Sequence, residues 1–168
     1  MKKPIFFLMF FFLLNSVISY GQARPNILWI TCEDISPYLG CYGDSLAVTP
    51  NLDRLATRGI RYTHAFANTA VCAPARSTII MGMYASTLGT ENMRSRYKVP
   101  DAFKPYPVYL REAGYYCTNH TKTDYNTSSF NREIWDDCSR TATYKNRKPG
   151  QPFFAIYNLT ISHEHIVF

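Results

Sequence analysis

The sequence has no pair of cysteines at CxxC spacing and no cluster of histidine and cysteine at zinc-binding spacing, which excludes a zinc finger or a zinc ribbon. It has no internal repeat, and its apolar runs are shorter than the roughly 20 residues that a membrane-spanning helix requires. The charged residues are scattered and form no basic stripe, so we expect no nucleic-acid partner. These absences leave a globular domain with its own core as the class that the composition favours.

Residues 1–23 have the layout of a secretory signal peptide, in which two lysines precede an apolar run over 5–14. Small residues then offer cleavage after Gly21 or after Ala23. The run is short for a membrane span, and a retained or lipid-linked anchor is the alternative. We therefore expect a secreted or periplasmic protein whose mature part, 24–168, has no stable membrane insertion.

All five cysteines follow the predicted signal peptide, and an odd number in an exported protein leaves at least one thiol unpaired. Cys32 and Cys117 lie within apolar runs and are predicted to be small buried residues. A disulfide between Cys117 and Cys138 is left open. Without the signal the net charge falls from +6 to +4, because two lysines and no acid are removed. This balance suits an anionic substrate without identifying one.

Predicted strands alternate with predicted helices along the mature chain. Strands are predicted over 26–32, 60–67, 115–119 and 153–159, and helices over 49–58, 74–82 and 107–113, the second helix with Ile79, Ile80 and Met83 on its inner face. This alternation indicates an α/β domain with a largely parallel sheet. The polar stretch 121–150 gives no clear prediction. Because ligands gather at the carboxyl ends of parallel strands, the polar residues Glu33, Asp34, Lys122 and His163 are expected to meet in one site.

The densest motif is the segment Val71-Cys72-Ala73-Pro74-Ala75-Arg76. Pro74 predicts the start of a helix, so the thiol of Cys72 lies at a helix N-terminus, where free N–H groups and the helix dipole favour negative charge. Arg76 is four residues further on and on the same face. The spacing alone is equally compatible with a buried cysteine beside a surface arginine.

The Cys-x-Pro-x-Arg pattern, followed by a helix and Gly82, resembles the signature of the type I sulfatases of the alkaline phosphatase superfamily. The resemblance implies an alkaline-phosphatase-like α/β sandwich with a largely parallel central sheet flanked by helices. It further implies that a sulfatase-maturation enzyme oxidises Cys72 to formylglycine, an aldehyde whose hydrate attacks sulfur. Arg76 is then expected to orient and stabilise this group.

Two further matches in chain order extend the resemblance, the first over 24–34 and 39–44, and the second over 49–53 and 59–60. The first is similar to the opening strand of the family, whose two adjacent acids bind Ca²⁺. The resemblance therefore implies Ca²⁺ at Glu33 and Asp34 together with modified Cys72. Glu33 stands where the family has Asp, which makes Asp34 the better expected ligand.

The remaining matches concern the groups around the sulfate. Lys122 corresponds to the lysine that holds a sulfate oxygen, whereas Asp124 stands where the family carries a histidine. His163 follows the last predicted strand and corresponds to the histidine near the sulfate or leaving group, in preference to His165. The general-acid side of the site is thus left open by the sequence.

The resemblance covers nearly all of 24–168 but only the first part of the family's usual length, so we expect an incomplete catalytic domain whose truncated sheet exposes an apolar edge after 153–159. The implied function is hydrolysis of sulfuric esters, on sulfated sugars or polysaccharides. The alternatives are a phosphodiesterase or phosphonate hydrolase of the same superfamily, and a truncated, non-catalytic remnant.

Overall fold

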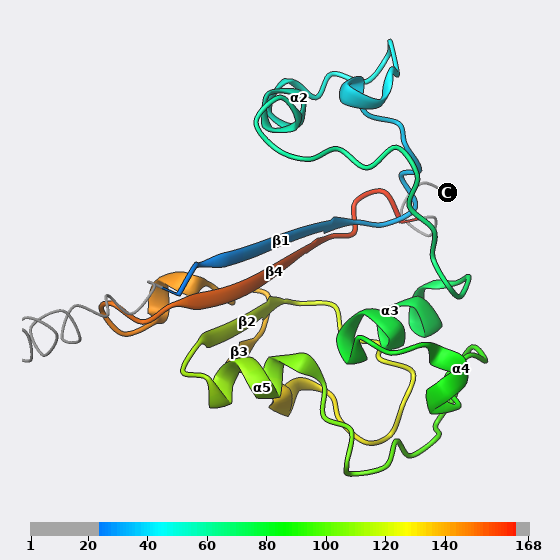
Figure 1. Ribbon diagram of the computed structural model, residues 1–168, viewed down its shortest axis with the longest axis vertical. Helices are drawn as coiled ribbons and strands as arrows, with labels where there is room; N and C mark the ends of the chain where they lie inside the picture. The colour runs from blue at the N-terminus through cyan, green and yellow to red at the C-terminus, as the bar shows by residue number, and fades with distance from the viewer. Residues whose placement is uncertain (1–23, 164–168) are drawn as a thin grey trace, which may run out of the picture.

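The computed structural model describes residues 24–163, and its centre is a sheet of four parallel strands in the order β1-β4-β2-β3 (Figure 1). The strands are β1 (Ile27–Cys32), β2 (Tyr116–His120), β3 (Asp137–Cys138) and β4 (Phe153–Leu159). Although β4 comes last, it lies between β1 and β2 and pairs with both along its length. The carboxyl ends of three strands from distant parts of the chain therefore meet at one edge of the sheet.

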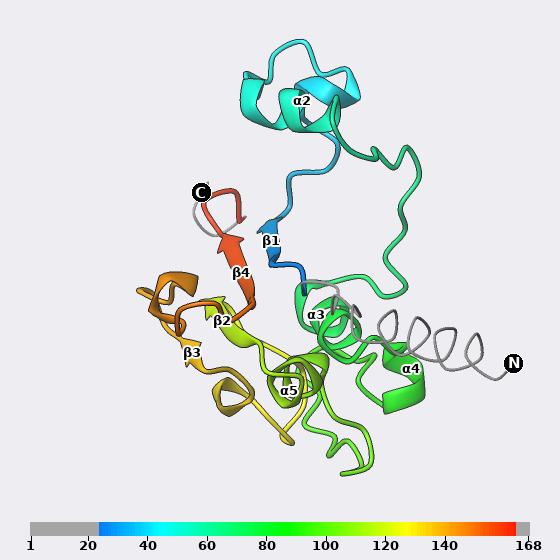
Figure 2. The ribbon, with the colours of Figure 1, turned by 60° about the vertical axis from the view of Figure 1, so that its left-hand side comes forward.

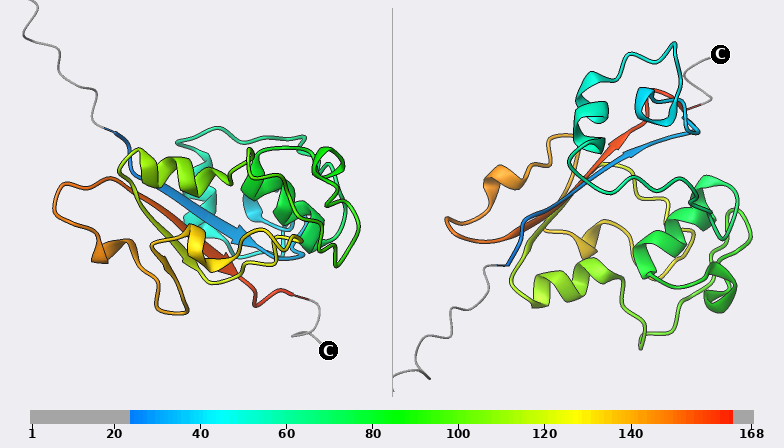
Figure 3. Two further views of the ribbon diagram at one scale, coloured as in Figure 1. Left: turned by 90° about the horizontal axis from the view of Figure 1, so that it is seen from below. Right: turned by 45° about the horizontal axis from the view of Figure 1, so that its top comes forward.

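Helices lie on both sides of this sheet. They are α2 (Pro50–Ala56), α3 (Cys72–Met81), α4 (Ala85–Leu88) and α5 (Tyr106–Glu112), with short 3-10 turns η1 (Gly40–Tyr42), η2 (Arg132–Ile134) and η3 (Tyr144–Asn146). α3, α4 and α5 gather on one side, and α2 with η1 lies on the other, joined by extended segments (Figures 2 and 3). The predicted α/β fold with a parallel sheet flanked by helices is confirmed.

The core lies between the sheet and the α3–α5 side. Phe154 and Ile156 of β4 pack there against Ile80 of α3. Phe154 stacks on Trp135 with ring centroids 5.8 Å apart, and it meets Tyr106 edge-on at 5.4 Å. Phe154, Ala155 and Ile156 are all buried, as expected for the middle of an interior strand of a parallel sheet, and this fits the continuous apolar run of β4.

Two local predictions differ from the structure. The strand predicted over 60–67 is irregular, with exposed side chains at Ile60 and Phe66. Its alternating pattern requires a neighbouring strand, and no strand of the described residues pairs with it. The helix predicted from Pro74 begins two residues earlier, at Cys72. Proline is tolerated there because the N–H groups of the first turn have no helical partner.

The expected apolar edge is also differently placed. β4 is an interior strand, so the edge belongs to β1, where Leu28 and Ile30 are exposed. In α3, Ile80 is buried as predicted, but Ile79 is exposed. Met83, which follows the end of α3, packs against the core as predicted.

None of the five cysteines, all of which the structure describes, forms a disulfide, so the bridge between Cys117 and Cys138 is absent. Cys117 is buried as predicted, and burial raises the pKa of its thiol to about 12. Cys32 is exposed, contrary to prediction, because β1 is the outer strand.

The predicted signal peptide, residues 1–23, and His165 lie outside the described residues. Within 24–163, none of the helices has the length and apolar character needed to cross a membrane.

Candidate active site

The site begins at the start of α3, where Cys72 is the first helical residue and is half-buried. Val71 precedes it with φ 73° and ψ 146°, a conformation that a β-branched residue adopts only when its surroundings enforce it. The carbonyl of Val71 accepts the first helical hydrogen bond, from Ala75 N–H at 3.1 Å. Backbone strain is therefore stored next to the predicted nucleophile, as is common at functional sites.

Arg76 joins α3 to the ends of two strands. Its Nε donates to the carbonyl of Thr123 at 2.7 Å, and one terminal nitrogen donates to the carbonyl of Lys122 at 2.5 Å. The other terminal nitrogen donates to Asn158 Oδ1 at 3.1 Å. With only 13 % of its side chain exposed, the guanidinium fixes the loop after β2 against β4. The alternative of a surface arginine beside a buried cysteine is thereby excluded.

Glu33 and Lys122 meet at the strand ends, as the sequence predicts. Glu33 Oε2 lies 2.9 Å from Lys122 Nζ, and Oε1 lies 3.9 Å from the Arg76 guanidinium. The exposed fractions of Glu33 and Lys122 are 11 % and 18 %. One carboxylate thus faces two cations in a partly desolvated place, where charge-assisted hydrogen bonds are strong.

Asp124 approaches the predicted nucleophile from the loop after β2. The Cys72 thiol donates to Asp124 Oδ2 at 3.8 Å, and Arg94 lies 4.0 Å from Oδ1 of the same carboxylate. Asp124 has φ 53°, a left-handed conformation that Asp tolerates better than most residues. Asp124, the position at which the resemblance leads us to expect a histidine, therefore contacts residue 72 directly.

Asp34 and His163 lie in the segments that follow β1 and β4. Asp34 comes directly after Glu33 and has φ 52°. His163 lies in a turn closed by its own N–H, which donates to the carbonyl of Thr160 at 3.0 Å. The neighbouring Ser162 hydroxyl donates to the carbonyl of Glu33, so this turn is tied to the end of β1.

Asn158 is a site residue that the motifs did not indicate. Its amide donates to Asn119 Oδ1 at 2.8 Å and to the carbonyl of His120 at 3.1 Å. Its Oδ1 accepts from Arg76 and also from Thr31 Oγ1 at 3.1 Å. The one signal in the sequence was a polar side chain near the end of an otherwise apolar strand.

Calcium-binding sites need about six to eight oxygen ligands. Among residues 24–163, no group of three or more His, Cys, Asp or Glu side chains is close enough to hold a metal. Both oxygens of Glu33 already face Lys122 and Arg76. The described residues therefore do not form a Ca²⁺ cage by themselves, and the prediction of Glu33, Asp34 and Cys72 as ligands stays a prediction.

The family model described as Sulfatase matches residues 25–166. The chain is 41 % identical over 159 residues to an ulvan-active sulfatase of Formosa agariphila, covering 86 % of this chain and 26 % of that protein. A protein solved in complex with its substrate D-glucosamine-2-N,6-O-disulfate has the same fold, with a TM-score of 0.71 and 22 % identity over 84 % of this chain and 35 % of that one.

A second solved structure, the phosphonate monoester hydrolase of Agrobacterium radiobacter, has a TM-score of 0.55 and 26 % identity over 84 % of this chain and 27 % of that one. The chain spans about a quarter to a third of the length of these three proteins. The family model covers most of the sequence, and its match contains the Cys72 motif and the strand ends described above. The chain belongs to the sulfatase family.

Proposed function

We propose that the protein bearing this chain hydrolyses sulfuric esters, with formylglycine formed from Cys72 as its nucleophile. The single observation that carries the proposal is the convergence of Arg76 and Lys122 on the strand ends beside the first turn of α3. Preorganised positive charge next to free helical N–H groups is what an oxyanion and its transition state require.

Formylglycine, when hydrated, supplies one oxygen that attacks sulfur and a second hydroxyl whose deprotonation expels sulfate. The residues of the chain supply the surroundings for this chemistry. Asp124 Oδ2, 3.8 Å from Cys72 Sγ, is placed to accept a hydrogen bond from the group at position 72. Lys122 neutralises charge on the sulfate oxygens. Arg76 holds the loop after β2, which carries both Lys122 and Asp124. His163 is assigned to the leaving-group side.

The finer parts of the proposal come from family membership. They are Ca²⁺ bound with the help of Glu33 and Asp34, and a maturation enzyme as partner for Cys72. Export behind a signal peptide is proposed from the residue pattern of 1–23. Among residues 24–163, Glu33 and Asp34 would need further ligands to complete a Ca²⁺ site.

A sulfated sugar or polysaccharide is the proposed substrate class. The ulvan-active sulfatase supports this class. The phosphonate monoester hydrolase supports the alternative activity on phosphorus esters, since sulfate and phosphonate esters have similar shapes.

The test is turnover by the full-length protein, matured in cells with a maturation enzyme. An aryl sulfate and an aryl phosphonate monoester of the same leaving group are compared, with Cys72→Ala as blank. We expect sulfate turnover well above the blank and above phosphonate turnover. Preference for the phosphonate would favour the alternative, and no turnover of either would favour a non-catalytic protein.

A further inference from the structure

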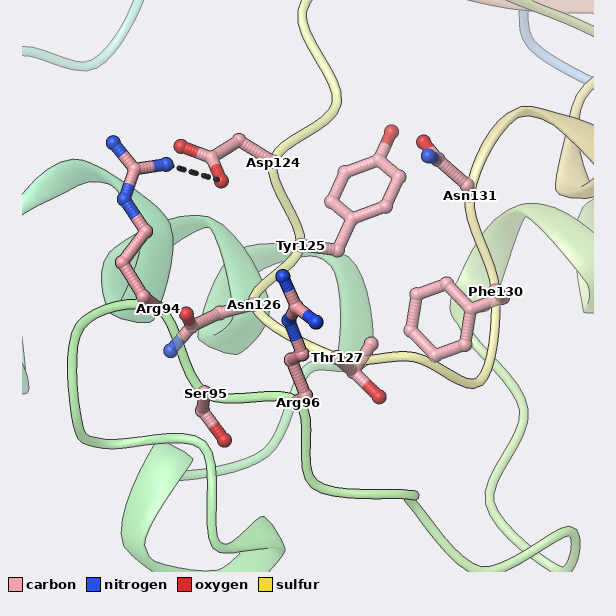
Figure 4. Close-up of a pocket in the computed structure, with 9 residues that line it drawn as sticks. All are labelled: Arg94, Ser95, Arg96, Asp124, Tyr125, Asn126, Thr127, Phe130 and Asn131. Atoms are coloured by element: carbon pink, nitrogen blue, oxygen red, sulfur yellow. Dashed lines mark ion pairs between the residues drawn. The ribbon is translucent and has the colours of Figure 1, made fainter.

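A cavity of about 230 Å³ opens beside Asp124 (Figure 4). Arg94 and Arg96 enter it from one loop, and Asp124 and Asn126 enter it from another. Phe130 forms an aromatic part of its wall, 5.8 Å from the ring of Tyr125. Asp124 lines the cavity and also contacts Cys72, so the cavity borders the candidate active site through this residue.

The arginine-bearing loop, residues 90–99, is held in place by hydrogen bonds to its backbone. Four consecutive side chains, from Asn126 to Ser129, donate to its carbonyl groups. Asn126 donates to Thr90 and Asn92 (both 2.7 Å), Thr127 to Tyr97 (2.7 Å), Ser128 to Arg96 (3.0 Å) and Ser129 to Val99 (3.2 Å). These five hydrogen bonds fix the backbone from which the two arginines extend, which lowers the backbone entropy lost when a ligand binds.

The charges of the cavity favour an anion. Arg94 faces Asp124 at 4.0 Å, but its side chain is 77 % exposed, and such exposed pairs contribute little. Within the described part of the chain, Arg96 has no carboxylate at ion-pair distance. The cavity therefore has two guanidinium groups but one carboxylate, which lies near Arg94 alone, and both guanidinium groups keep donors that match carboxylate or sulfate oxygens in pairs.

We propose that Arg94 and Arg96 bind a second anionic group of the substrate, a carboxylate or a second sulfate on the sugar chain, while the scissile sulfate lies at residue 72. This inference rests on the proposed function and specifies its substrate class as a polyanionic glycan. Asp124 repels the second anion from the nucleophile and accepts a hydrogen bond from a sugar hydroxyl. Phe130 packs against the apolar face of a sugar ring.

The first experiment measures selectivity in the full-length protein. Arg94→Gln, Arg96→Gln and the control Arg58→Gln, which changes an exposed arginine near α2, are assayed on three substrates. These are an aryl sulfate, a sulfated disaccharide with a uronate carboxylate, and a doubly sulfated disaccharide without carboxylate. Loss of a charge-assisted pair lowers kcat/KM for a second-anion substrate relative to the aryl sulfate by about 10- to 100-fold, mainly through KM. Whichever disaccharide responds identifies the anion, and the control leaves the ratio unchanged.

The second experiment needs no turnover. Calorimetry with an unsulfated uronate disaccharide, and with inorganic sulfate, compares the wild type with the same variants. Arginine-dependent binding in a protein that hydrolyses no sulfate ester would overturn the proposed function but retain this site. Turnover with unchanged selectivity and unchanged binding in both variants would overturn the inference. If circular dichroism shows that the glutamine variants are misfolded, Arg94→Lys and Arg96→Lys are tested in their place. Lysine keeps the charge but loses the planar pair of donors, so the inference requires that these variants lose part of the selectivity for the second-anion substrate.

Discussion

Arg76 gives the sharpest test of how the site is built, because its role in the structure can be separated from catalysis. Replacement by Gln removes hydrogen bonds to the carbonyls of Thr123 and Lys122 and to Asn158 Oδ1. Each of these hydrogen bonds has a charged donor, and the Arg76 side chain that supplies it is only 13 % exposed. Truncating such a group leaves partly buried acceptors without a donor.

The size of the effect follows from these contacts. Hydrogen bonds to charged groups contribute about 1.5–3 kcal/mol each, but water reaches part of the site and glutamine replaces one donor. We therefore expect Arg76→Gln to lower the free energy of unfolding by about 2–4 kcal/mol. The exposed control Arg58→Gln is expected to change it by no more than about 0.5 kcal/mol.

Urea unfolding of the purified protein, followed by tryptophan fluorescence, measures both variants. The m-value should stay constant, so the loss appears as a lower midpoint. A loss below about 1 kcal/mol for Arg76→Gln would mean that the guanidinium does not hold the loop after β2, and the site would lack the rigidity assigned to it.

Three further results are expected. After expression with a maturation enzyme, mass spectrometry of the tryptic peptide containing residue 72 should show the mass loss of cysteine-to-aldehyde conversion, and an unmodified thiol in every copy would contradict the nucleophile. Glu33→Gln removes the negative charge that faces Lys122, so calorimetry should show tighter binding of inorganic sulfate than in the wild type, whereas unchanged or weaker binding would contradict the pairing. Burial raises the Cys117 pKa from 9.0 to about 12, so the protonated thiol stabilises the fold below pH 9, and this contribution is lost as pH rises from 9 through 12. The free energy of unfolding of Cys117→Ala should fall less steeply than that of the wild type over this range, and equal slopes would contradict burial of the thiol.

The parts of the site that follow from local rules could be predicted from the sequence. Arg76 lies one helical turn from Cys72. Glu33 and Lys122 both follow parallel strands, whose carboxyl ends meet at one edge of the sheet, and Glu33 Oε2 lies 2.9 Å from Lys122 Nζ. Both predictions depend only on a period or on the direction of a strand. The apolar run of β4 likewise identified a buried strand.

Long-range pairing explains what could not be predicted. The position of β4 between β1 and β2 is set by which strands meet in space, and no local pattern near 153–159 encodes it. The network of Asn158 depends on that position, because its partners come from β1, α3 and β2. The prediction of a strand over 60–67 was wrong for the same reason. Alternation of apolar and polar residues produces a strand only when a neighbouring strand is available to pair with it.

Glu33 illustrates how the two kinds of information combine. Its place in the motif predicts a metal ligand, whereas its contacts are those of a carboxylate that balances Lys122 and Arg76. Removing a carboxylate from partly buried cations leaves their charge uncompensated, which is strongly destabilising. The sulfate of the proposed substrate would be a second anion for Lys122 and Arg76, and Glu33 would then be available as a metal ligand. The ion pairs at the strand ends and the proposed binding of sulfate beside residue 72 would thus be linked through Glu33.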